Sequence, residues 1–207
     1  MKLKRFAAGF IAAVMALAVL GTPLGDILPF VRESVATTAG AEKYIWGAFS
    51  YDILDDGTVV ITRYNGYGGD AKTVDIPSEI DGKIVTKIGD WAFSGSYSLE
   101  RIVIPYGVKS IGAAAFNCCD SLKSITISNS VTNIGELAFQ LCTSLISITI
   151  PANVTNIGNN AFASCTSLNE IDVDENNQFY INDNGILFST DKSRLIKYSS
   201  KKNRGKF

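Results

Sequence analysis

Three consecutive stretches of the sequence decide the fold, because they repeat one another without a gap. They are LERIVIPYGVKSIGAAAFNCCDS (residues 99–121), LKSITISNSVTNIGELAFQLCTS (122–144) and LISITIPANVTNIGNNAFASCTS (145–167), each 23 residues long, and a fourth opens with LNEIDV at Leu168. A strict period over several units is typical of a solenoid, in which each coil buries its apolar face by stacking on its neighbours. The sequence therefore predicts an array of stacked 23-residue coils.

Residues of one kind recur at the same place in each coil. The apolar columns are Leu99, Leu122, Leu145 and Leu168; Ile104, Ile127, Ile150 and Val173; Ile88, Ile111, Ile134 and Ile157; and Phe93, Phe116, Phe139 and Phe162. A glycine column (Gly89, Gly112, Gly135, Gly158) and an alanine column (Ala92, Ala115, Ala138, Ala161) accompany them. Because stacking brings the members of a column together, we expect the phenylalanines to form a ladder in the core.

The coil from 122 to 144 shows how one unit is expected to fold. Apolar and polar residues alternate over 124–127, which predicts a strand, and the β-branched run 131–134 predicts a second extended segment. We expect Gly135 to mark a tight bend, and helical spacing of apolar residues predicts a short helix over 136–142. Strands of successive coils should pair in parallel. The expected fold class is an α/β-type repeat solenoid, a parallel strand ladder with short helices.

The same residues carry a family resemblance. The pattern LxxIxIPxxVxxIGxxAFxxC, nearly intact in the three quoted coils, resembles the BspA-type leucine-rich repeat of bacterial surface and secreted proteins. The sequence departs from it at Ser128, where the proline of Pro105 and Pro151 is missing, and at Ser96, where the cysteine of the column is missing. The resemblance covers about residues 74–198 and implies a leucine-rich repeat in a secreted or cell-surface protein.

Both ends of the array are expected to carry β-hairpin caps, because a solenoid exposes its apolar core at its two ends. Strand-like runs flank Asp55-Asp56-Gly57 before the array and Asp183-Asn184-Gly185 after it, and such turns are typical of hairpins. An insertion around 80–83 predicts a further hairpin in the first coil. The expected organisation is an N-terminal cap over 42–73, the solenoid over 74–173, a C-terminal β cap over 174–198 and a polar tail over 199–207.

The N-terminus has the features of a secretory signal. Met1–Arg5 is basic, residues 6–20 form an apolar run without a charge, and Ala39-Gly40-Ala41 offers the small residues that signal peptidase requires. The apolar run is shorter than the roughly 20 residues that span a bilayer comfortably. We expect a signal peptide over 1–41, cleaved after Ala41, and secretion without a membrane span. An uncleaved anchor is the alternative, because 21–38 is long for a cleavage region.

The composition argues against several classes of function. The sequence contains no histidine, which removes the commonest general base, the Ser-His and Cys-His nucleophile pairs and histidine-bound zinc. Its 19 basic and 20 acidic residues give a net charge of −1, which does not indicate a nucleic-acid partner. We expect no cofactor and no catalytic activity.

Cysteines and carboxylates offer chemistry that we interpret as structural. Cys119, Cys142 and Cys165 form a column, and parallel Cβ vectors in stacked coils favour buried free thiols over a disulfide, with Cys118 pointing elsewhere as the most reactive thiol. The stretch 172–183 superficially resembles a calcium loop but lacks its glycine, so a polar capping turn is preferred. Carboxylates on turns share no spacing that would indicate a glycosidase pair; they are Asp52, Asp55, Asp56, Asp70, Asp172 and Asp174.

The outward positions of the predicted strands form a candidate ligand-binding face. They are Arg101, Ser124, Ser147 and Glu170 and, two residues along each strand, Val103, Thr126, Thr149 and Asp172. Small hydroxyls lie between a basic end and an acidic end, an arrangement suited to docking, although Ser and Thr are also ordinary solvent-facing strand residues.

Three hypotheses follow. The preferred one is a monomeric secreted or surface binding module that mediates protein–protein or adhesive contacts with a protein or glycan ligand. The alternatives are a structural stub of a larger repeat protein and, least favoured, a carboxylate-dependent polysaccharide hydrolase.

Overall fold

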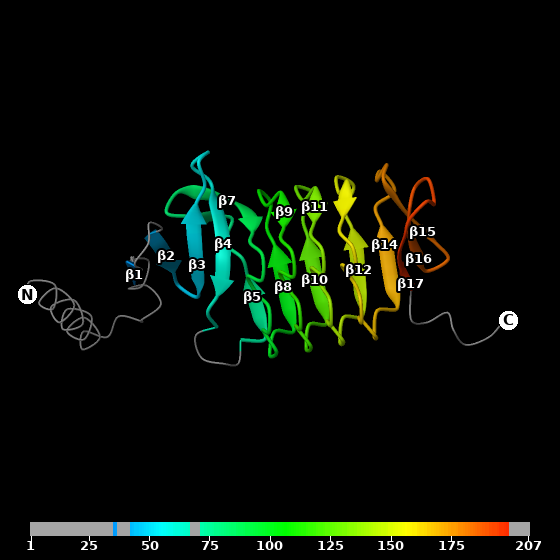
Figure 1. The fold of residues 1–207 in the computed structure, drawn as a ribbon, viewed down its shortest axis with the longest axis horizontal. Helices are drawn as coiled ribbons and strands as arrows, with labels where there is room; N and C mark the ends of the chain where they lie inside the picture. The colour runs from blue at the N-terminus through cyan, green and yellow to red at the C-terminus, as the bar shows by residue number, and fades with distance from the viewer. Residues whose placement is uncertain (1–34, 37–41, 67–70, 199–207) are drawn as a thin grey trace, which may run out of the picture. The chain divides into compact units, whose positions relative to one another are not determined.

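A computed structural model describes residues 35–36, 42–66 and 71–198 (Figure 1). Within these ranges every regular element is a β-strand, and there is no helix long and apolar enough to cross a membrane. The expected leader, apart from β1 (Val35–Ala36), lies outside the described residues, as do the expected cleavage site and polar tail.

One wall of the array is a five-stranded parallel sheet with the order β14-β12-β10-β8-β5 (Figure 1). Each coil contributes one short strand: β5 (Thr73–Asp75), β8 (Arg101–Ile104), β10 (Ser124–Ile127), β12 (Ser147–Ile150) and β14 (Glu170–Val173). Neighbours from β8 to β14 are paired with an offset of one 23-residue repeat, so Ser124 lies opposite both Arg101 and Ser147. The predicted parallel strand ladder is confirmed.

The other wall is a nine-stranded sheet with the order β1-β2-β3-β4-β7-β9-β11-β13, in which β6 pairs with β7. Its further strands are β2 (Glu42–Trp46), β3 (Phe49–Ile53), β4 (Val59–Tyr64), β6 (Glu79–Ile80), β7 (Lys83–Ile88), β9 (Ser110–Ile111), β11 (Asn133–Ile134) and β13 (Asn156–Ile157). The turns predicted at 55–57 and around 80–83 each connect the two strands of an antiparallel hairpin, β3–β4 and β6–β7 respectively.

The chain between the two walls does not form the predicted short helix over 136–142, and that prediction is wrong. Leu137 and Leu141 have positive φ, 57° and 60°. Alternate amides donate across to the next coil: Leu137 to Asn159, Phe139 to Ala161 and Leu141 to Ala163, at 2.8–3.0 Å. An α-helix directs its amides to carbonyls four residues back and leaves none for a neighbouring coil, so bonding between coils excludes it.

The glycine column also has a different role from the one expected. Gly135 does not have positive φ, so the chain needs no special conformation there. A Cβ added to Gly135 would lie 2.6 Å from the carbonyl carbon of Gly112, and one added to Gly158 would lie 2.3 Å from the backbone nitrogen of Glu136. Glycine is therefore required because successive coils approach too closely for a side chain.

The core between the two walls consists of the predicted columns. Phe93, Phe116, Phe139 and Phe162 are buried, and their successive ring centroids lie 5.0, 5.3 and 5.5 Å apart. Near-parallel stacked rings at this spacing match the separation of successive strands in a parallel sheet. The expected phenylalanine ladder is confirmed.

The missing proline at Ser128 is compensated by hydrogen bonds. The Ser128 hydroxyl donates to the carbonyl of Pro105 at 2.9 Å, and the hydroxyl of the buried Ser130 donates to the carbonyl of Val108 at 2.7 Å. Both bonds link this coil to the preceding one, so the departure from the repeat leaves the stacking intact.

A three-stranded antiparallel sheet follows the last coil: β15 (Tyr180–Asp183), β16 (Ile186–Ser189) and β17 (Leu195–Tyr198). Tyr180 in β15 and Arg194, just before β17, bond the backbone of β13. The Tyr180 hydroxyl accepts from the Ile157 amide at 2.7 Å, and the Arg194 side chain donates to the Ile157 carbonyl at 3.1 Å. The side-chain amide of Asn182 likewise donates to the backbone carbonyl of Ile171 in β14. The last strand of each wall thus finds partners without another coil.

Candidate functional site

All eight predicted face residues lie on the outward side of the five-stranded sheet. The register aligns them in two rows, Arg101-Ser124-Ser147-Glu170 and Val103-Thr126-Thr149-Asp172. Their neighbours along each strand, such as Ile102 and Ile148, are buried, because alternate residues of a strand point to opposite faces. We call the outward side of β5, β8, β10, β12 and β14 the strand face.

The strand face is wider than the sequence predicted. In β5, Thr73 pairs with Arg101 and Asp75 with Val103, and both β5 residues are exposed. The two rows therefore begin one strand earlier. The signal was present, because Val74-Asp75-Ile76-Pro77 repeats the pattern of residues 102–105.

A charged network borders the strand face where β5, β8 and β10 begin. Glu100 lies between two lysines, with its carboxylate oxygens 3.0 Å from Lys72 Nζ and 2.6 Å from Lys123 Nζ. The hydrogen bonds from Lys123 and then Lys72 lower the pKa of Glu100 below its ordinary value. With Arg101 beside it, this corner holds three basic groups against one acidic group.

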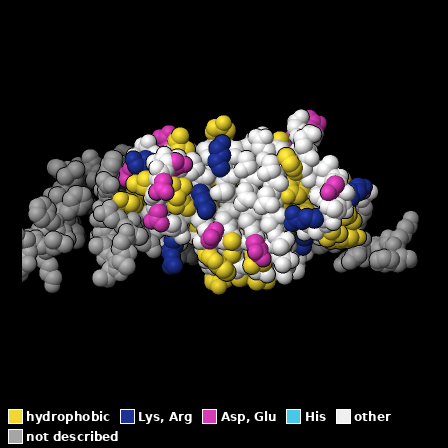
Figure 2. Space-filling view, turned by 45° about the horizontal axis from the view of Figure 1, so that its top comes forward, with side chains coloured by type: hydrophobic (Ala, Val, Ile, Leu, Met, Phe, Trp, Pro, Cys, Tyr) yellow, Lys and Arg dark blue, Asp and Glu magenta, His cyan; other side chains and the backbone are white. Residues whose placement is uncertain are grey.

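The opposite end of the strand face is acidic and carries Glu170 and Asp172, both exposed. Between the two ends the residues are Ser124, Thr126, Ser147 and Thr149, of which the threonines are exposed and the serines half-buried. On the side of the molecule drawn in Figure 2, uncharged polar side chains and backbone cover much of the middle of the array, and acidic side chains gather at the left end of the view. A partner would thus meet an uncharged centre between an acidic end at β14 and an end at β5 and β8 where basic groups outnumber the carboxylates of Glu100 and Asp75.

Known protein families and structures match this chain over its repeats. Residues 66–191 match the family model described as "BspA type Leucine rich repeat region (6 copies)". The chain belongs to this family. No curated protein matches it in sequence.

Solved structures of bacterial leucine-rich repeat proteins resemble this BspA-type chain. A protein from Bacteroides capillosus is 32% identical, with a TM-score of 0.59, covering 64% of this chain and 98% of its own. The pneumococcal vaccine antigen PcpA is 24% identical (TM-score 0.58, covering 80% of this chain and 58% of its own). A protein from Eubacterium ventriosum is 23% identical (TM-score 0.50, 74% and 49%). The last two show a shared fold only.

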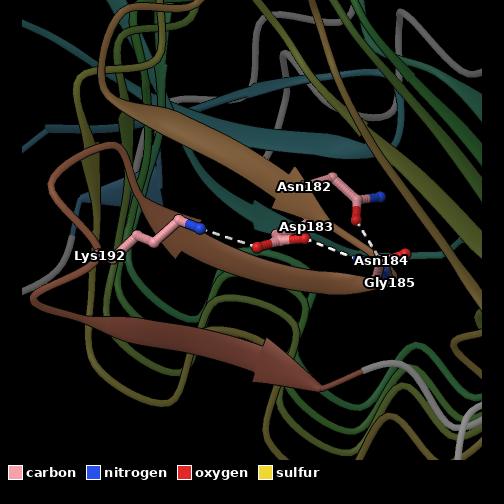
Figure 3. A network of polar contacts seen from close by, with 5 residues as sticks. All are labelled: Asn182, Asp183, Asn184, Gly185 and Lys192. Atoms are coloured by element: carbon pink, nitrogen blue, oxygen red, sulfur yellow. Dashed lines mark hydrogen bonds and ion pairs between the residues drawn. The ribbon is translucent and has the colours of Figure 1, made fainter.

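Two carboxylates of the acidic stretch 172–183 in this BspA-type protein, those of Asp174 and Asp183, accept hydrogen bonds within the chain. Asp174 Oδ1 accepts from the Asn176 amide at 2.9 Å. Asp183 accepts from Lys192 at 2.8 Å and from Asn184 at 2.9 Å, beside a bond from the Gly185 amide to Asn182 (Figure 3). These contacts are those of polar turns and support the structural interpretation over a calcium loop.

The remaining described carboxylates of the candidate set fall in two places, the β3–β4 hairpin and the strand face. Asp56 is in the β3–β4 turn, where bonds from the Thr58 hydroxyl and amide lower its pKa, and Asp172 is on the strand face. Asp52 is in β3 and Asp55 in the same turn as Asp56, whereas Asp70 lies outside the described residues. The described carboxylates Asp52, Asp55 and Asp56 therefore share one hairpin, and Asp172 lies in a different sheet.

The cysteine column is buried, and the four cysteines are free thiols in the structure. Cys119, Cys142 and Cys165 donate to the carbonyls of Phe93, Phe116 and Phe139, respectively, at 3.0–3.2 Å. The neighbouring Cys119 thiol and then burial raise the pKa of Cys142, and burial raises the pKa of Cys165 to about 11.

Cys118 differs from the column because it is half-buried and its thiol donates to the side chain of Asn117 at 3.0 Å. That it is the most reactive thiol stays a prediction, since reactivity depends on both exposure and thiolate character.

Proposed function

We propose that this protein is a secreted or cell-surface binding module that holds a macromolecular partner on its strand face by protein–protein or adhesive contacts. The observation that carries the proposal is the register of β5, β8, β10, β12 and β14, which aligns their outward side chains in continuous rows. Solenoids use extended regular surfaces of this kind for binding, and membership of a bacterial leucine-rich repeat family supports the same role.

The charges at the two ends of the strand face would orient the partner. An acidic group would be attracted to Arg101, Lys72 and Lys123, and a basic group to Glu170 and Asp172. Electrostatic complementarity at a rim acts mainly on register and on the rate of association. Affinity would come from shape-matched contact over Thr126 and Thr149, which leave room because their side chains are small.

Secretion and capping complete the proposal. The basic and apolar segment 1–41 would act as a signal peptide, cleaved after Ala41, and the mature module would be monomeric. The hairpin β3–β4 and the sheet β15–β17 would serve as caps. The bonds that Tyr180 and Arg194 make to Ile157 support this role for the second sheet, because a cap must satisfy the last strand.

Binding of the mature chain, residues 42–207, to a panel of matrix proteins, mucins and plant and bacterial polysaccharides would test the strand face. The double variant Thr126→Arg, Thr149→Arg places two bulky charges at its centre and is expected to lower binding by tenfold or more. The control is Thr132→Arg, Thr155→Arg, which changes two exposed threonines of the same coils outside the strand face.

Loss of binding in the first variant alone would support the proposal. Equal binding by the two variants would place the site elsewhere on the chain. If the folded protein bound nothing in the panel, the structural module without its own ligand would be the better account.

A further inference from the structure

A pocket of about 340 Å³ lies beside the first coil. Its walls come from Tyr64 at the end of β4 and the two residues that follow it, from Ala71, and from residues 94–99, which lead to β8. This volume falls at the lower end of the range of about 300–1,000 Å³ that is usual for small-molecule sites.

The repeat itself shows what is special about this pocket. Positions 95–97 line it, and at each of them the first coil differs from every later coil. Gly95 corresponds to Cys118, Leu141 and Ser164; Ser96 corresponds to Cys119, Cys142 and Cys165; and Tyr97 corresponds to Asp120, Thr143 and Thr166. The missing cysteine that marks Ser96 as a departure in the sequence is thus one of three adjacent changes at a single concave site.

The backbone does not explain the glycine. Gly95 has a φ of 73°, but Cys118, Leu141 and Ser164 have φ between 57° and 60° at the same place and carry side chains. A Cβ at Gly95 would be in ordinary van der Waals contact with the Tyr97 ring, 3.7 Å from its hydroxyl end, so glycine leaves the space beside the ring open where a larger side chain would occupy it. Tyr97 is 64% exposed, so much of its side chain is available to a ligand.

The chemistry of the walls selects a class of ligand. None of the described residues that line the pocket carries a charge, so these residues offer no counter-charge to an ionic ligand. The lining residues include the two tyrosines Tyr64 and Tyr97 and the three serines Ser94, Ser96 and Ser98. A sugar ring has the matching surface, because its C–H face packs on an aromatic ring while its hydroxyls form hydrogen bonds.

We propose that this pocket binds a neutral pyranose unit of a glycan, with Tyr97 as the aromatic platform and the serines as hydrogen-bonding partners. The site is separate from the contacts proposed for Thr126 and Thr149. The protein would then carry two binding surfaces: the strand face for a macromolecular partner and the pocket for a single sugar residue.

Saturation-transfer NMR of the full chain with methyl glycosides of glucose, galactose, mannose and N-acetylglucosamine, at about 10 mM to match a weak site, tests the proposal. Tyr97→Thr introduces the residue that the two last coils have at this position, Thr143 and Thr166. Gly95→Leu introduces the residue that the third coil has, Leu141, and its side chain would occupy the space beside the Tyr97 ring. The control is Tyr106→Asn, which changes a tyrosine that is 78% exposed to the residue of the next coil, Asn129.

We expect at least one glycoside to bind and both pocket variants to weaken it by tenfold or more, with the control unchanged within about twofold. Transfer to none of the glycosides would overturn the proposal, as would equal binding by Tyr97→Thr and the unmodified chain. Thr126→Arg, Thr149→Arg should leave glycoside binding unchanged, so the pocket and the strand face can fail independently. Circular dichroism of each variant confirms that it is folded.

Discussion

At the scale of single residues, the repeat places strong demands on positions that look interchangeable in the sequence. Gly112 and Gly135 face each other across coils with no room for a methyl group. Leu137 and Leu141 adopt positive φ, which leucine rarely does, because each amide there bonds to the next coil. The energy of stacking outweighs the local preference in both cases.

Gly135→Ala is therefore expected to lower the free energy of unfolding by about 1–3 kcal/mol, the usual cost of overpacking, since the new Cβ would meet backbone rather than a movable side chain. Urea denaturation measures it. Glu136→Ala, at the exposed neighbouring position, is the control and should change stability by less than about 0.5 kcal/mol. A Gly135→Ala variant as stable as the control would show that the coils can separate at small cost.

At the scale of elements, the sheet β15–β17 supplies hydrogen bonds to the last strand of the array in place of a further coil. Tyr180 lies 23 residues after Ile157, at the position where the next isoleucine of the column would be. Its hydroxyl accepts a hydrogen bond from the Ile157 amide, in place of a backbone carbonyl of a following strand. Asn177 is buried and donates to the carbonyls of Pro151 and Val154 while accepting from the amides of Phe179 and Tyr180. Side chains thus take over the bonding that backbone provides inside the array.

Tyr180→Phe removes that acceptor and leaves the Ile157 amide buried without a partner. The expected loss of stability is about 1–3 kcal/mol, the cost of an unsatisfied buried donor. Hydrogen exchange should also quicken at Ile157 and not at Ile134, whose strand lies inside the array. Tyr198→Phe, which removes a hydroxyl from an exposed tyrosine, serves as the control. Unchanged exchange at Ile157 would show that the hydroxyl bond contributes little.

At the scale of the whole molecule, the buried ionisable groups set how stability depends on pH. The pKa of Cys165 is raised to about 11 by burial, and the pKa values of Cys142 and Tyr180 are also raised. Because the pKa of Cys165 is higher in the folded protein, the thiol loses its proton at a lower pH in the unfolded chain. The free energy of unfolding is therefore unaffected by the ionisation of this thiol below about pH 9 and falls as the pH rises toward 11.

Denaturant midpoints measured from pH 7 to pH 11 should therefore fall above pH 9. Cys165→Ala should reduce the slope between pH 9 and 11, because alanine does not titrate, whereas Cys118→Ala removes a thiol that is only half-buried and is the control. If the slope were the same in the two variants, Cys165 would not be responsible for it.

The sequence by itself determined the period, the phase and the identity of the columns, and with them the parallel ladder, the phenylalanine stack and the eight outward residues from Arg101 to Asp172. These follow from position alone, because identical coils stacked at one spacing bring identical residues together. The tertiary structure decided the rest. It replaced the short helix by turns, gave the glycines a packing role, added Thr73 and Asp75 to the strand face and gathered residues 95–97 around a pocket. Each of these depends on contacts between coils, and a pattern within one coil holds no information about how closely the next coil approaches or where its amides find their partners.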